Sequence, residues 1–202
     1  MSKGLMLIIS GPAGSGKGTV NAHLLATNDF VYSVSATTRA PRPGEKNGVN
    51  YHFISKEDFL GRISSGDMLE YTEYCGNFYG TPKKEAEAVL ESGKNLILEI
   101  EIDGAHQVKK KYPDAVLIML LPPSFAVQEQ RLRSRGTETE DKILARLERT
   151  KEELLDIESY DYVVYNHDAK DTDAAAQIMA IVNAERCSIK RNKNAREKYF
   201  EH

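Results

Sequence analysis

The sequence has no apolar run long enough to cross a membrane. Its longest runs, Leu5–Ile9 and Ala115–Leu121, are far shorter than the ~20 residues that a transmembrane helix needs. The first run begins within a few residues of the start, and we expect no signal peptide before it. These absences predict a soluble, cytoplasmic protein with no membrane partner.

Cysteine and histidine are scarce and scattered. The only two cysteines, Cys75 and Cys187, lie far apart and match no metal-binding or redox spacing, so we expect two reduced thiols. The five histidines also lack metal-ligand spacing. We therefore expect no metal ion held by a cluster of protein ligands.

Positive charge does not dominate, because the net charge is −3 at pH 7. Nucleic-acid-binding proteins usually carry a strongly basic surface, so we expect no nucleic-acid partner. An anionic substrate must instead meet a local cluster of cations. The basic C-terminal tail, residues 186–202, is interpreted as a solvated chain end.

What the sequence does contain is the pattern of one folded domain. Its 202 residues, 41% hydrophobic and 28% charged, suit a single domain with an insertion. Apolar runs, typical of strands buried on both faces of a parallel sheet, alternate with segments of helical periodicity. The expected strands are Leu5–Ile9, Val31–Val34, Asn95–Ile100, Ala115–Leu121 and Tyr162–Tyr165. This alternation predicts a doubly wound α/β core formed by residues 1–35, 92–123 and 152–185.

Two segments interrupt the core. Residues 36–91 are rich in Gly, Tyr and Arg and predict an inserted, partly β lobe. Residues 124–151 are rich in Arg and contain the first part of an apolar stripe of helical spacing, which predicts a helical segment. The stripe consists of Ile143, Leu144, Leu147, Leu154 and Leu155.

A glycine-rich loop follows the first predicted strand and precedes a helix. Such a loop lets backbone N–H groups converge on phosphate. Its lysine, Lys17 here, would reach the outer phosphates of a nucleoside triphosphate. Gly18 stands where many such loops carry a Mg²⁺-binding hydroxyl, so Mg²⁺ is expected to be held mostly by phosphates and water. The residues expected to bind ATP are Gly11, Pro12, Ala13, Gly14, Ser15, Gly16, Lys17, Gly18 and Thr19.

Four further segments, in this order and at these spacings, resemble the guanylate kinase family. They read SVSATTRAPRPGE, NGVNYHF, LEYTEYCGNFYGTP and RLRSRGTETE, and the resemblance runs from about Leu5 to Val182. It implies a P-loop nucleoside monophosphate kinase that transfers a phosphoryl group from ATP, with Mg²⁺, to GMP. Residues 36–91 would then form the GMP-binding lobe and residues 124–151 the lid.

The resemblance also implies roles for individual residues. Glu70 matches the carboxylate that reads guanine, and Ser35 and Thr81 match hydroxyls that donate to guanine O6. Glu101 matches an acidic position near the guanine, usually Asp. The residues matching those that hold the phosphate of GMP are Arg39, Arg42, Tyr51 and Tyr79. Taken singly, each of these residues would more often be solvated or packed for structural reasons, and it is their occurrence as an ordered set that favours the functional roles.

In the lid, Lys142, Arg146 and Arg149 follow helical spacing and could also form an ordinary solvated face. The resemblance favours a mobile lid in which Arg135 and Arg146 close on the nucleotides. The expected catalytic residues are Lys17, Arg42, Arg135 and Arg146. Asn166 is expected either near the adenine of ATP or as a turn residue.

Two alternatives to a guanylate kinase remain at this point. One is a kinase of another nucleotide such as AMP, against which Glu70, Ser35 and Thr81 argue. The other is a guanylate kinase-like module that has lost catalysis and binds partner proteins. The intact Lys17 and loop glycines argue against that module. The sequence leaves open the oligomeric state and the use of dGMP.

Overall fold

A five-stranded parallel sheet forms the centre of the computed structural model, which describes residues 3–134, 136 and 139–201. Its strands, in spatial order, are β2 (Phe30–Tyr32), β7 (Asn95–Leu98), β1 (Met6–Ser10), β8 (Val116–Leu121) and β9 (Tyr162–Tyr165). All four neighbouring pairs run parallel, which confirms the predicted doubly wound α/β core.

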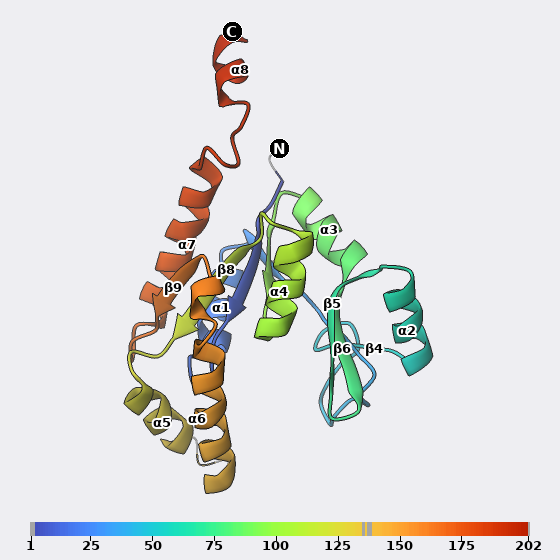
Figure 1. Cartoon of the computed structure of the whole chain (residues 1–202), viewed down its shortest axis with the longest axis vertical. Coiled ribbons are helices and arrows are strands. Elements are labelled where there is room, and N and C mark those ends of the chain that lie inside the picture. The colour runs from blue at the N-terminus through green and yellow to red at the C-terminus, as the bar shows by residue number, and fades with distance from the viewer. Residues whose placement is uncertain (1–2, 135, 137–138, 202) are drawn as a thin grey trace.

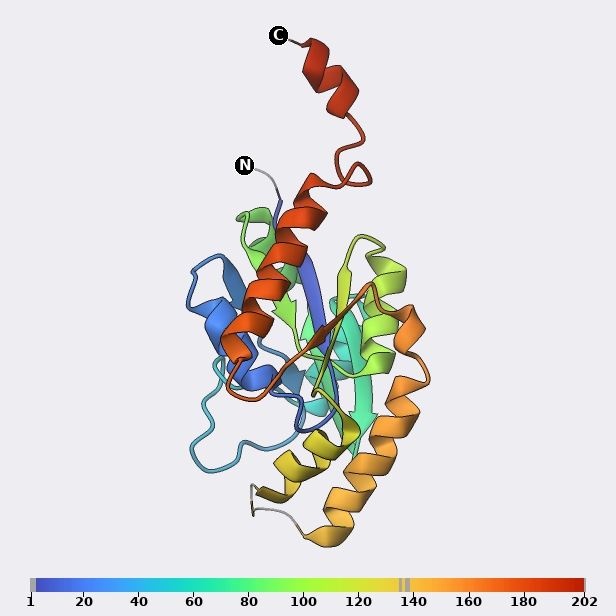
Figure 2. The same cartoon turned by 90° about the vertical axis from the view of Figure 1, so that its left-hand side faces the viewer.

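Helices cover both faces of this sheet (Figures 1 and 2). On one face α1 (Lys17–Leu25) and α7 (Asp171–Cys187) pack on Leu7 and Ile9. On the other face α3 (Lys83–Glu91) and α4 (Ile102–Lys111) pack on Ile8. The side chains of β1 therefore alternate between two apolar layers, as a strand buried on both faces requires.

The edge strand β9 differs from the prediction. It was expected to be buried throughout, but only Val164 is buried, while Val163 and Tyr165 are 45% and 46% exposed. The reason is its place at the edge of the sheet, next to β8 alone. The expected strand Val31–Val34 is also displaced, because β2 ends at Tyr32.

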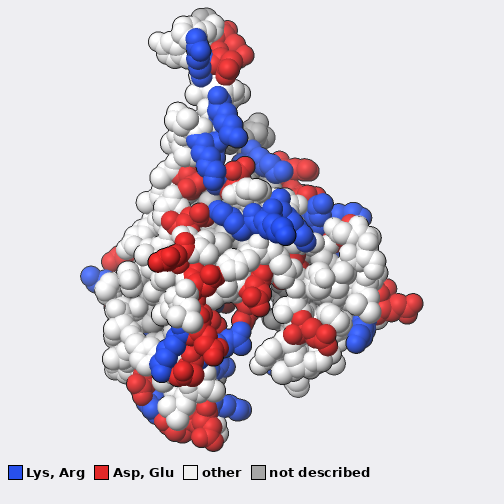
Figure 3. Space-filling view, in the orientation of Figure 1, with Lys and Arg blue, Asp and Glu red and all other residues white. Residues whose placement is uncertain are grey.

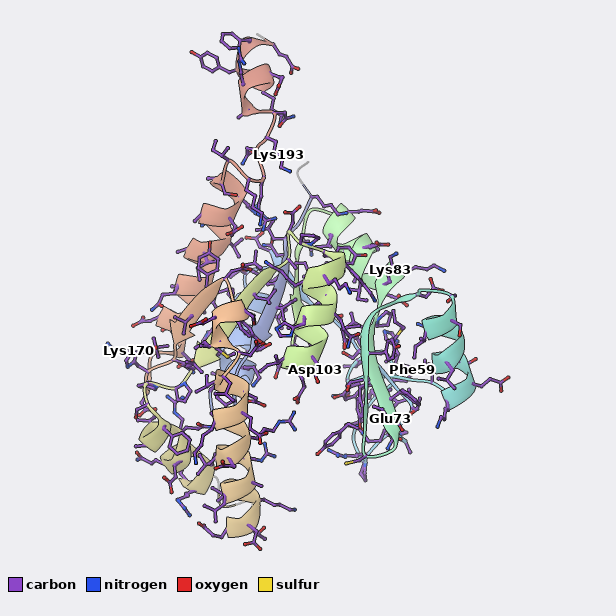
Figure 4. All side chains as sticks on the ribbon, in the orientation of Figure 1. Phe59, Glu73, Lys83, Asp103, Lys170 and Lys193 are labelled. Carbon is purple, nitrogen blue, oxygen red and sulfur yellow. The ribbon has the colours of Figure 1, made fainter. Side chains whose placement is uncertain are left out.

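The inserted segment forms a second, four-stranded sheet in the order β4-β3-β6-β5. These strands are β3 (Ala36–Thr37), β4 (His52–Phe53), β5 (Met68–Tyr74) and β6 (Asn77–Pro82). Helix α2 (Lys56–Ser64) begins after Ser55, whose hydroxyl accepts from the Asp58 amide at 3.0 Å. Phe59 of α2 points at the sheet, and its ring stacks on that of Phe78 with 5.5 Å between the ring centroids (Figure 4). This contact belongs to a small apolar core of the lobe itself.

The segment expected as the lid contains α5 (Phe125–Ser134) and α6 (Glu140–Leu154). The apolar stripe expected on α6 is only partly correct. Ile143 and Leu147 are buried, but Leu144 and Leu155 are 51% and 86% exposed. The buried face of α6 continues instead through the polar residue Thr150, which is 2% exposed.

The lid segment and the inserted lobe extend from the same end of the molecule, and the space-filling view shows an open gap between them (Figure 3). At the opposite end, α8 (Ala195–Phe200) stands away from the rest of the chain (Figures 1 and 2). The 3-10 helix Ile157–Ser159 links α6 to β9. No helix of the described chain is long and apolar enough to span a membrane.

Candidate active site

The glycine-rich loop connects β1 to α1, as predicted, and its backbone takes a shape that requires glycine. Gly14 and Gly16 have φ angles of 87° and 89°, in the left-handed region that residues with a Cβ rarely adopt. A Cβ on Gly16 would lie 2.3 Å from Nδ2 of Asn166. Because α1 begins at Lys17, its positive N-terminal end faces the concave side of this loop.

The loop is supported from the end of β9. Asn166 is buried, and its Nδ2 donates to the carbonyl of Ser15 at 2.9 Å. The side chain of Lys17 donates to the carbonyls of Gly11 and Pro12. The structure thus brings Asn166 against the phosphate-binding loop, whereas its expected contact with adenine stays a prediction.

Arg131 of α5 reaches the same loop, although the sequence indicated it only as one of several lid arginines. Its guanidinium donates to the Gly14 carbonyl at 3.1 Å and to the Asn166 carbonyl at 2.8 Å. It also pairs with Asp168 at 2.6 Å. Beside it is a pocket of about 260 Å³ whose lining includes Gly14, Gly16, Thr19, Arg131, Asn166 and Asp168.

The inserted lobe gathers the residues expected to hold the acceptor phosphate. Arg39 lies over the ring of Tyr51, 5.6 Å from its centroid, and the rings of Tyr51 and Tyr79 are 6.1 Å apart. Both carboxylate oxygens of Glu45 accept from Arg39, at 2.9 and 3.0 Å. This hydrogen bonding holds the pKa of Glu45 below its usual value. Arg42 is exposed, and its backbone N–H donates to Glu45 at 2.7 Å.

The guanine-reading candidates, Glu70 and Thr81, meet inside this lobe. Glu70 is only 4% exposed, and the hydroxyl of Thr81 donates to its Oε1 at 2.7 Å. Burial raises the pKa of the Glu70 carboxyl, although the hydrogen bonds from Thr81 oppose the rise. Gly104 of α4 allows this close approach, because a Cβ there would lie 2.9 Å from Glu70 Oε2.

Two acidic residues follow β7 and have different partners. Glu101 is exposed and forms an ion pair with Arg149 of α6. Glu99 accepts from Asn21 of α1 and from the Tyr32 hydroxyl, both at 3.1 Å. The pKa of Tyr32 is raised, mainly by burial of its hydroxyl and to a smaller extent by the nearby Glu99 carboxylate. No local pattern in the sequence indicates these two partners of Glu99.

Ser35 and Arg146 lie on other parts of the chain. Ser35 lies beside the lobe sheet, where its carbonyl accepts from the His52 amide at 2.8 Å. Arg146 lies on the exposed side of α6. Arg135 falls outside the described residues. Helix α6 begins at Glu140 directly after Thr139.

A phosphate-binding loop on a doubly wound sheet, facing a lobe that presents arginines, tyrosines and a buried carboxylate, defines a P-loop nucleotide kinase. The sequence profile described as guanylate kinase matches residues 3–185. The chain belongs to the guanylate kinase family.

Individual relatives agree with this assignment. The chain is 46% identical to the guanylate kinase of Clostridium tetani, over 96% of this chain and 93% of that protein. It is 47% identical to the guanylate kinase of Clostridioides difficile, over 96% and 94% of the two chains. The crystal structure of guanylate kinase from Anaplasma phagocytophilum has a TM-score of 0.73 at 36% identity, covering 95% of this chain and 90% of that one.

Proposed function

We propose that this protein transfers the γ-phosphoryl group of ATP to GMP, giving ADP and GDP, in purine nucleotide metabolism and GMP recycling. The observation that carries the choice of GMP is the buried carboxylate of Glu70. Guanine offers a carboxylate its N1–H and its exocyclic amine, whereas adenine has no such pair of donors. Membership of the guanylate kinase family supports the same acceptor.

In this proposal the phosphate of GMP takes its hydrogen bonds from the four matching residues of the lobe. Arg39 supports this role because its guanidinium is already oriented by Glu45. A planar guanidinium can donate two parallel hydrogen bonds to two phosphate oxygens at once, a geometry that an ammonium group does not offer. The four residues are Arg39, Arg42, Tyr51 and Tyr79.

The remaining cations act on the migrating group. Phosphoryl transfer spreads negative charge over the transferred oxygens, so catalysis is mainly positioning and electrostatic stabilisation. Lys17 would reach these oxygens from the loop, Arg42 from the lobe, and Arg135 and Arg146 from the lid. No covalent intermediate on the protein is needed.

Mg²⁺ is proposed to arrive with ATP. When bound, it neutralises charge on the phosphate oxygens and polarises the transferred group. The described residues include no group of three or more acidic, His or Cys side chains that could hold a metal ion. Thr19 offers an exposed hydroxyl next to the loop, which fits an ion that keeps most of its water ligands. The reaction is proposed to take place in the cytoplasm.

A panel of monophosphates with MgATP tests the proposal. GMP should be strongly preferred over AMP, and IMP, which lacks the exocyclic amine, should lose at least about tenfold in kcat/KM. Glu70→Gln should lower kcat/KM for GMP and reduce the difference in kcat/KM between GMP and IMP. The reason is that only the oxygen of the amide can accept a hydrogen bond from guanine, whereas both oxygens of the carboxylate can. Equal use of AMP and GMP would contradict the proposal, and no turnover of any nucleotide would favour a partner-binding module.

A further inference from the structure

One buried amide connects three segments that meet beneath the phosphate-binding loop. Gln128 lies on the inner face of α5 and is 1% exposed. Its Nε2 donates to the carbonyl of Ala13 in the loop at 3.0 Å and to the hydroxyl of Thr150 on α6 at 2.7 Å. Both protons of one side-chain amide are therefore used to join the loop, α5 and α6.

The surroundings of this amide are apolar. Ala13 and three buried side chains, Leu132, Ile143 and Leu147, form one cluster between the loop and the two helices. Apolar packing alone would allow α6 to shift against the loop, because apolar contacts are not directional. A buried amide that loses its hydrogen-bond partners, in contrast, is destabilised by the uncompensated loss of water. Gln128 therefore selects one arrangement of α6 against the loop, since any shift would break its hydrogen bonds.

The hydrogen bonds continue from the amide to the lid arginine. The Thr150 hydroxyl, which accepts from Gln128, donates in turn to the backbone carbonyl of Arg146 at 2.9 Å. An unbroken series of contacts thus runs from the Ala13 carbonyl to the backbone of Arg146, one turn earlier on α6. It joins the part of the protein that would hold ATP to the arginine that would meet the transferred phosphoryl.

We propose that Gln128 is a positioning residue for phosphoryl transfer, because it sets the place of α6 relative to the phosphate-binding loop and so aims Arg146. Because it is only 1% exposed, we expect its side chain to touch neither nucleotide. This role rests on the proposed function of Arg146 in the kinase reaction.

The test is a double-mutant cycle on kcat. Gln128→Met keeps the length and packing of the side chain but removes the amide, and it should lower kcat by about tenfold or more while KM for GMP stays within about twofold. In an Arg146→Ala background the same change should cost far less, because the arginine that it misplaces is already absent. Gln130→Met, an exposed position on the same helix, is the matched control and should leave kcat unchanged.

Failure of the positioning role can be distinguished from failure of the proposed function. A folded Gln128→Met variant with wild-type kcat, or with an equal loss in both backgrounds, would overturn the positioning role. If Gln128→Met does not fold, Thr150→Val removes the shared hydroxyl at nearly constant volume and must show the same non-additivity with Arg146→Ala. A wild-type protein inactive on GMP would instead overturn the proposed function, and this is seen before any variant is compared.

Discussion

Gly16 and Gly18 stand two residues apart at the start of α1, but their surroundings leave different room for a side chain. Gly16 has a φ of 89°, and its added Cβ would lie 2.3 Å from Nδ2 of Asn166. Gly18 has no heavy atom within 4 Å of such a Cβ. Gly16 is therefore constrained by both its backbone conformation and its neighbour, and Gly18 by neither.

We predict opposite effects of alanine at these two positions. Gly16→Ala should distort the loop and reduce kcat/KM for ATP by about 100-fold, since a small misplacement of catalytic groups is costly. Gly18→Ala should keep activity within about threefold and raise the melting temperature, because alanine favours a helix over glycine by up to ~1 kcal/mol. Steady-state kinetics and thermal unfolding check both variants. A fully active Gly16→Ala protein would contradict this account of the loop.

Glu70 combines its proposed role in binding guanine with a cost to stability. Burial raises the pKa of its carboxyl, so the charged form is less favourable in the folded chain than in the unfolded chain. Protonation of this carboxyl therefore increases the free energy of unfolding. This contribution is present at low pH and is lost as the pH rises through the raised pKa of the folded protein. Glu70→Gln should therefore raise the melting temperature of the nucleotide-free protein at pH 7, by about 2–4 °C for each kcal/mol gained.

The pH dependence provides the control for this prediction. The difference in melting temperature between Glu70→Gln and the wild type should shrink as the pH falls through the raised pKa. Below that pH the wild-type carboxyl becomes neutral as well. Over the same range the wild type should bind GMP more weakly, since a protonated carboxyl cannot accept both guanine protons. A variant less stable than the wild type at pH 7 would contradict the cost assigned to burial.

Single residues in this site differed in how well the sequence indicated them. Lys17 and the loop glycines were predicted from spacing alone, because a phosphate cradle is a local structure. The hydrogen bond from Asn166 to Ser15 and the contact between Gly104 and Glu70 were not predicted. These contacts join residues far apart in the sequence, and they depend on how strands and helices pack rather than on any local pattern.

At the scale of elements, buried strands were predicted better than surface helices. Runs such as β8 are apolar throughout because both faces of a central strand are covered. The stripe on α6 was less reliable, since Leu144 is exposed while Thr150 is buried. That helix packs on the phosphate-binding loop as well as on α5, so a polar residue with a partner replaces an apolar one.

The C-terminal tail contains a structural part and a detached part. Next to α7, Arg191 donates to Glu185 and to the Asp114 carbonyl, at 2.8 and 2.6 Å. Asn192 donates to the carbonyls of Arg186 and Ser188 at 2.8 and 2.9 Å, which satisfies groups at the end of the helix. Helix α8, in contrast, has no buried residue and stands away from the body (Figure 2).

Two truncations should therefore behave differently. Removal of residues 194–202 should leave the melting temperature within about 1 °C and kcat unchanged, since surface segments contribute little to stability. Removal of residues 189–202 also deletes Arg191 and Asn192, and it should lower the melting temperature by several degrees. Equal melting temperatures for the two truncated proteins would show that these hydrogen bonds do not support α7.

At the scale of the whole molecule, the order of the segments largely determines where the site lies. The carboxyl ends of β1 and β9 bring the phosphate-binding loop and Asn166 to one edge of the sheet. The inserted lobe and the lid segment leave the core at that same edge (Figure 1). The sequence predicted these attachment points from alternating apolar runs, but it could not give the separation of the two parts, which depends on tertiary contacts.

We predict that the lid segment and the inserted lobe approach one another when both nucleotides are bound. The residues proposed to bind ATP lie on the core, most of those expected to bind GMP lie on the lobe, and an open gap separates lid and lobe (Figure 3). Transfer between two phosphates requires direct approach in a site that excludes water, so the arrangement must close when both nucleotides are bound. Small-angle X-ray scattering should therefore give a smaller radius of gyration with GMP plus a non-hydrolysable ATP analogue than with either nucleotide alone. AMP in place of GMP is the matched control and should produce less contraction, because it lacks the donor pair for Glu70. An unchanged radius with both nucleotides bound at saturation would mean that the gap does not close, and that the lid arginines cannot act as proposed.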